Sequence, residues 1–165
     1  MKLKINFYPD SGDPKILQAT KEYQLIWKSE GEKIIKTINK ITGLKFKAKF
    51  FNIIVFEGMS HSFPLRLRAS YPNNVKTAAL IHETCHRLLT ESNVDHFRKD
   101  ALEQHKELYL VLYDIWEDLY GEKWANENVL VESKRQEFYK QAFDWALSMD
   151  QEQRQDKFKE TFTKK

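Results

Sequence analysis

Residues 75–90 contain the pattern His-Glu-x-x-His, formed by His82, Glu83 and His86. Residues four apart in an α-helix project from the same face, so the two imidazoles can bind one cation. Glu83 follows the first histidine and can reach a water on that cation without being a ligand itself. Two nitrogen ligands, a polarised water and a carboxylate base are what a zinc hydrolase requires. The pattern therefore predicts a helix that carries a metal site.

The neighbouring residues favour a buried helix. Pro72 precedes Asn73 and Asn74, and either asparagine can cap the helix N-terminus. The run that follows is apolar around most of its circumference, with Ala78, Ala79, Leu80, Ile81, Cys85, Leu88 and Leu89. Such a helix is buried, and its polar side chains need partners because unpaired polar groups are costly inside a protein. The alternative, that the His-Glu-x-x-His pattern arose by chance on an exposed helix, agrees poorly with these apolar neighbours.

Residues 81–89 resemble the active-site helix of the zincin metallopeptidases. The metzincin branch has a glycine three residues after the second histidine and a further histidine three residues later. This chain has Leu89 and Ser92 at those positions, which excludes that branch. The remaining similarity is to the gluzincin-like group, in particular its minimal, single-domain members. The resemblance implies a small zincin-like domain, one Zn²⁺ per chain and peptidase activity.

Apolar periodicity and turn residues predict an α+β fold with a short three-stranded sheet. The order of these expected helices and strands resembles that of zincins, which extends a weaker resemblance to most of the chain. The expected elements are a strand near residues 3–7, a long helix from Pro14 to Gly43, strands over 45–57 and 63–70, the metal-site helix, a helix from about 96 or 99 to 120, and a last helix from about 122 to 149. Residues 1–149 are interpreted as one zincin-like catalytic domain. Residues 150–165 are interpreted as a polar tail that is either frayed or a loosely docked helix.

In residues 63–70, apolar side chains alternate with Pro64, Arg66, Arg68 and Ser70, which indicates a strand with one buried face. Pro64 cannot donate to a neighbouring strand, so the segment is expected to be an exposed edge strand. Its place just before the metal-site helix matches the zincin edge strand that pairs with an extended substrate. An ordinary sheet edge, protected by arginines and a proline, is the competing interpretation.

A catalytic zinc takes three protein ligands and leaves one position for water. Eighteen residues separate His105 from the second histidine of the pattern, and gluzincins often place a glutamate ligand at that separation on the next helix. We predict His105 as the third ligand, because it shares a helical face with inward-facing residues. His96 competes, although its charged neighbours suggest a solvated turn. Asp114 and Glu107 are carboxylate candidates, and Asp114 is better interpreted as a supporting or salt-bridge residue.

Composition adds few constraints. Cys85 is the single cysteine, so no internal disulfide forms, and it is interpreted as a small core residue rather than a ligand. The start of the chain lacks the apolar region of a signal peptide, and no stretch approaches the roughly 20 apolar residues of a membrane span. These features predict a cytoplasmic protein without a membrane partner. The formal net charge of +3 does not by itself indicate nucleic-acid binding.

The sequence thus predicts a zinc-dependent metallopeptidase that acts on a peptide or protein substrate. His82, His86 and His105 hold the metal, and Glu83 is the general base. A second hypothesis is a non-catalytic zinc-binding or interaction protein that keeps the zincin fold, although structural zinc does not need Glu83. A nucleic-acid-associated protein is a third hypothesis, for which the candidate basic residues are Lys45, Lys47, Lys49, Arg66 and Arg68.

Overall fold

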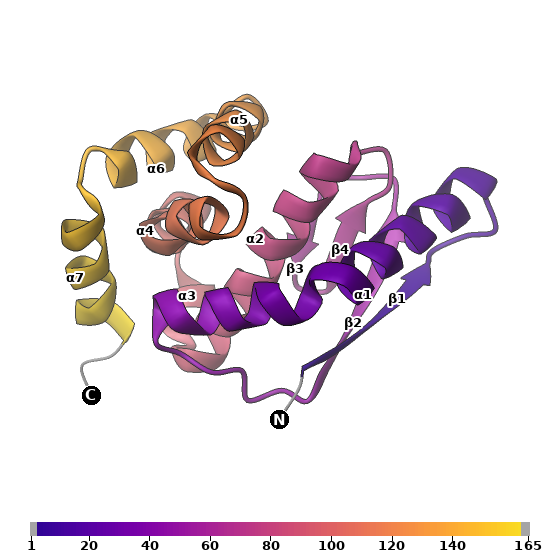
Figure 1. Cartoon of the computed structure of the whole chain (residues 1–165), viewed down its shortest axis with the longest axis horizontal. Coiled ribbons are helices and arrows are strands. Elements are labelled where there is room, and N and C mark those ends of the chain that lie inside the picture. The colour runs from indigo at the N-terminus through magenta and orange to yellow at the C-terminus, as the bar shows by residue number, and fades with distance from the viewer. Residues whose placement is uncertain (1–2, 163–165) are drawn as a thin grey trace. The chain divides into compact units, whose positions relative to one another are not determined.

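The computed structural model describes residues 3–162 and shows an α+β fold (Figure 1). The described residues form one mixed sheet of four strands and seven helices. The chain divides into two compact units, one made of Met1–Lys36 and Phe46–Arg87, the other of Thr37–Lys45 and Leu88–Lys165. The predicted α+β class is confirmed, and the sheet has one strand more than predicted.

The first unit contains the sheet. Its strands are β1 (Lys4–Pro9), β2 (Phe50–Phe56), β3 (His61–Ser62) and β4 (Leu65–Arg68). They lie in the order β1-β2-β4-β3. β1 and β4 both run parallel to β2, and the two-residue β3 runs antiparallel to β4. β1 and β3 are therefore the two edges of the sheet.

The prediction that residues 63–70 form an exposed edge strand is wrong. β4 covers only Leu65–Arg68 and lies between β2 and β3, with His61 paired to Arg66 and Ser62 to Leu65. The chain reverses between β3 and β4 through Phe63 and Pro64, which are joined by a cis peptide bond. Pro64 thus belongs to the turn, where its backbone needs no hydrogen-bonding partner in the sheet. Its missing N–H therefore does not indicate whether β4 is an edge strand.

Helix α1 (Pro14–Thr42) covers one face of this sheet within the first unit (Figure 1). Its apolar side contributes Tyr23, whose ring stacks on Phe7 of β1 at 6.1 Å between centroids. The Tyr23 hydroxyl also donates to the Arg68 carbonyl, at 2.8 Å. The helix ends before Gly43, whose φ of 68° is accessible to glycine at little cost. This end agrees with the prediction.

The second unit consists mainly of helices around α4. These are α3 (Asp95–Arg98), α4 (Ala101–Tyr120), α5 (Glu122–Ser133), α6 (Glu137–Leu147) and α7 (Gln151–Phe162), and α4 packs against each of the other four. Asp100 caps α4 by accepting from the Glu103 amide at 2.9 Å, and Gly121 follows its last residue with φ 87°, as predicted. Buried aromatic rings fill the interior, with Tyr109 and Phe143 stacked at 3.6 Å between centroids.

The predicted helix over residues 122–149 is in fact two helices, because the chain turns between Ser133 and Glu137. The segment expected to be frayed or loosely docked forms α7 in the described residues. Phe158 is 2% exposed, and the buried Arg154 guanidinium donates to the Asp114 carboxylate of α4. Apolar and charged anchors thus hold a helix whose composition is otherwise polar.

None of the helices in the described part of the chain combines the length and apolar character that crossing a membrane requires.

A buried ion pair joins α1 to the start of α2 (Asn73–Ser92) in the first unit. The Lys76 ammonium lies 2.5 Å from Glu22 Oε2, and the Lys76 side chain is 5% exposed. The hydrogen bond from Lys76 holds the pKa of the Glu22 carboxyl below its usual value, against a smaller opposing effect of burial. Burying an ammonium is costly unless it is paired, so Glu22 compensates for the position of Lys76.

We predict that Glu22→Gln lowers the free energy of unfolding at pH 7 by about 1–3 kcal/mol, because the buried ammonium loses its anionic partner. Urea unfolding measures this, with Glu30→Gln on the same helix as a control that changes stability by less than about 0.5 kcal/mol. The depressed pKa means that the pair stabilises the fold above the unfolded-state pKa of glutamate. That contribution is lost as the pH falls through the folded-state pKa. If Glu22→Gln lowered the free energy of unfolding by the same amount at pH 7 and pH 3, the effect would come from packing and not from the ion pair.

Candidate metal centre

The His-Glu-x-x-His residues lie in the middle of α2. His82, Glu83 and His86 are 4%, 5% and 4% exposed, in a helix whose apolar residues are almost all buried. The two imidazole rings are neighbours, with 4.9 Å between their centroids. The predicted buried helix is therefore confirmed, as is the placement of both histidines on one face of it.

His105 lies in the second turn of α4 and is 7% exposed. Its Nδ1 is 2.6 Å from the Ala101 carbonyl oxygen, one helical turn earlier. A carbonyl oxygen only accepts hydrogen bonds, so in this contact Nδ1 carries the proton and donates it. The lone pair of the neutral imidazole is then on Nε2. A metal-binding histidine is commonly oriented in this way by a backbone carbonyl.

Three aromatic side chains surround the His105 ring. The distances between ring centroids are 5.5 Å to Tyr109, 5.3 Å to Phe138 and 4.6 Å to Tyr139. Tyr109 follows His105 on α4, whereas the other two lie at the start of α6. No local pattern in the sequence indicates which helix packs against α4, so these two neighbours were not predicted. The packing of the three rings limits rotation of the imidazole.

His82, His86 and His105 each offer one ligand atom, and these atoms all lie within 4.8 Å of one another. A tetrahedral zinc, bound at roughly 2.0–2.1 Å from each nitrogen, would place the nitrogens about 3.4 Å apart. Among residues 3–162, this is the one cluster of three histidine, cysteine, aspartate or glutamate side chains with such spacing. The three buried histidines can hold a metal ion, and imidazole ligands suit zinc, copper, iron or nickel.

The charged neighbours of His96 suggested a solvated turn, but the structure shows that this residue is buried. It is 1% exposed in α3, and its Nδ1 lies 2.6 Å from Glu107 Oε2. Lys99 donates to the other Glu107 oxygen. Burial raises the pKa of the Glu107 carboxyl, but the hydrogen bonds from His96 and Lys99 outweigh it and lower the pKa overall. His96 and Glu107, both candidate ligands by sequence, are thus partners of each other.

Asp114 and Cys85 also lie outside the histidine cluster. Asp114 is 2% exposed and pairs with Arg154, which confirms its interpretation as a salt-bridge residue. Cys85 is 1% exposed, and burial raises the pKa of its thiol, as expected for a core residue. The Tyr109 hydroxyl donates to Glu132 Oε1 at 2.8 Å. The cluster therefore consists of the three histidines that the sequence predicted as ligands.

Comparisons of the chain with models of known protein families, with curated proteins and with solved structures find no significant match. The similarity to zincins thus rests on residues 81–89 of the sequence.

We predict that His105→Phe weakens zinc binding by at least about 100-fold, because it removes one of three nitrogen ligands. Phenylalanine suits the aromatic surroundings of residue 105, so the metal-free protein should unfold at nearly the wild-type temperature. Competition with a chelator of known affinity measures the binding, and thermal unfolding with and without zinc measures the linked stabilisation.

His61→Phe is the matched control, because His61 lies in β3 outside the cluster. It should leave zinc affinity unchanged. If His105→Phe bound zinc as tightly as the wild-type protein, while His96→Phe or Glu107→Gln did not, the third ligand would lie in the His96–Glu107 pair instead.

Proposed function

We propose that the protein is a zinc-dependent hydrolase, most simply a peptidase of the minimal zincin type. His82, His86 and His105 would hold one Zn²⁺ per chain, and Glu83 would act as the general base. The observation that carries this proposal is the convergence of three buried imidazoles beside a carboxylate that a structural site does not need. Peptide or protein as the substrate follows from the resemblance of residues 81–89.

Each residue has a distinct part in the proposed reaction. Bound zinc would supply Lewis acidity, polarising a substrate carbonyl and lowering the pKa of its water. Glu83 follows His82 directly, about 100° further around α2, where its carboxylate could reach a water on the metal without being needed as a ligand. It would accept a proton from the attacking water and then donate it to the leaving amine. The Ala101 carbonyl and the surrounding rings would keep the His105 lone pair directed at the metal.

The ligand set differs from the gluzincin pattern, in which the third ligand is a glutamate. Three neutral imidazoles leave the full charge of the cation uncompensated, whereas a carboxylate ligand removes part of it. A three-histidine set, as in carbonic anhydrase, is associated with a zinc-bound water of pKa near 7. The proposed site therefore favours activation of water at neutral pH.

The burial of the histidines favours a second candidate function, a non-catalytic zinc site. All three are no more than 7% exposed, so a metal bound there would be shielded from solvent. In that case the metal would contribute to folding, and Glu83 would be a buried carboxylate with a packing role. The two functions make opposite predictions for a variant at residue 83.

We predict that Glu83→Gln binds zinc with nearly the wild-type affinity but loses about 10²–10⁴-fold in the rate of peptide hydrolysis, because the amide cannot accept a proton. The substrates would be an unfolded, fluorescently labelled protein and a mixture of short peptides, assayed with zinc-loaded enzyme. Zinc content is measured on the same samples.

Glu91→Gln, near the end of the same helix, is the control and should keep wild-type activity. A Glu83→Gln protein that hydrolysed substrate at the wild-type rate would exclude Glu83 as the base. If the zinc-loaded wild-type protein hydrolysed nothing, and removal of zinc greatly lowered its stability, the site would be structural.

A further inference from the structure

Strand β1 has one open edge within the described part of the chain. It is the terminal strand of the sheet there and pairs with β2 alone. The Lys4 amide donates to Lys49 and the Asp10 amide to Val55, both on the β2 side. In a parallel pair, alternate residues direct both backbone polar groups to the same neighbour, so the even-numbered residues of β1 face β2. The N–H and C=O groups of Ile5 and Phe7 therefore face away from the sheet.

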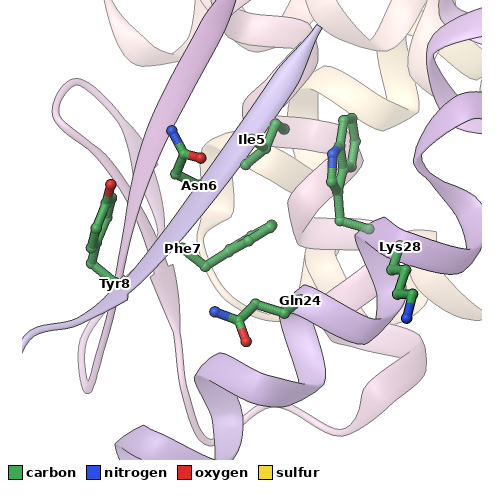
Figure 2. A pocket seen from close by; sticks show the side chains of 7 residues that line it. Ile5, Asn6, Phe7, Tyr8, Gln24 and Lys28 are labelled. Carbon is green, nitrogen blue, oxygen red and sulfur yellow. The ribbon is translucent and has the colours of Figure 1, made fainter. Parts of the chain in front are cut away.

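A hollow of about 360 Å³ lies along this open edge. It is lined from β1 by Ile5, Asn6, Phe7 and Tyr8, and from α1 by Gln24, Trp27 and Lys28. Figure 2 shows Ile5 and Phe7 pointing from β1 towards α1, and Gln24 and Lys28 on the facing turns of the helix. The hollow therefore has a row of backbone hydrogen-bonding groups on one side and long polar side chains on the other.

Trp27 is positioned by a glycine one turn later on α1. A Cβ atom on Gly31 would lie 2.7 Å from the Trp27 ring, closer than such atoms approach in real structures. The absence of a side chain at residue 31 allows the indole to lie back along the helix. The half-buried indole thus presents an apolar surface in the hollow, beside the open backbone groups.

The lining of the hollow, among the described residues, carries one positive charge. Lys28 is the one charged residue among the described residues that line it, and Lys4 is exposed at the start of β1. Lys21 lies two turns before Lys28 on the same stripe of α1. A partner with carboxylates at the matching positions would gain attraction, and one with lysines would be repelled.

We propose that this hollow binds an extended acidic peptide segment, which adds to the sheet as a new strand beside β1. The backbone groups of Ile5 and Phe7, about 6.6 Å apart along the strand, would pair with alternate residues of the peptide. Because alternate side chains of the added strand lie on one face, its acidic residues would face α1, with their methylene groups on Trp27 and a carboxylate near Lys28. Main-chain pairing supplies affinity in this mode of recognition, and the side chains supply the preference for acidic sequences.

A second copy of the chain is a poorer occupant of this edge. Pro9 lacks an N–H at the end of the edge, which shortens the row available for pairing with another β1. A short peptide needs only the two central residues, Ile5 and Phe7.

The test is an NMR titration of the full chain with the capped peptide Glu-Val-Glu-Val-Glu-Val. Binding should shift the amide signals of Ile5 and Phe7 and slow their hydrogen exchange by at least tenfold. The same peptide with N-methyl groups on alternate residues, on the edge that pairs, should not bind, because it has lost its donors. The Lys-Val analogue should bind less tightly than the acidic peptide.

Lys28→Glu should weaken binding of the acidic peptide by about two- to fivefold, as expected for an exposed ion pair, and strengthen binding of the lysine analogue. Lys36→Glu is the matched control, because it makes the same charge change on an exposed turn of α1 outside the hollow. Binding that survives N-methylation on both edges, or shifts confined to residues outside β1 and α1, would overturn the proposal. So would dimerisation through β1 that excludes the peptide.

Discussion

The cost of burying polar side chains in α2 determines much of what surrounds them. His82, Glu83 and His86 are each at most 5% exposed, within a helix whose apolar residues are all buried. Unpaired polar groups in such surroundings destabilise a protein by several kcal/mol, so partners have to be supplied. The cluster with His105 brings together three imidazoles that one cation could bind at once.

The other ionisable side chains near α4 show why this cluster contains histidines alone. His96 and Glu107 form a buried pair, and Asp114 pairs with Arg154. Each of these carboxylates therefore has a cationic or hydrogen-bonding partner of its own. His105 instead directs Nδ1 to the backbone of its own helix. The hydrogen bond of Nδ1 fixes the orientation of the His105 ring and so the direction of Nε2. A metal-binding histidine is commonly held in this way.

Local patterns predicted the parts of the structure that depend on local interactions. The beginning of α1 at Pro14, the caps of α4 at Asp100 and Gly121, and the buried middle of α2 all follow from residues within one or two turns. His105 was selected by its spacing and its inward-facing neighbours, which are also local. The sheet order was not predictable in this way. The assignment of 63–70 as an edge failed because Pro64 belongs to a turn that brings back the two-residue strand β3.

The burial of His96 and the docking of α7 have the same cause. Charged neighbours made His96 resemble a surface residue, and a polar composition made residues 151–162 resemble a frayed end. Each instead has a specific charged partner on α4, Glu107 for His96 and Asp114 for Arg154. One buried charged contact does not change the average polarity of a segment, yet it fixes where that segment lies. Composition therefore underestimates order wherever a few specific contacts, rather than a continuous apolar face, attach an element to the core.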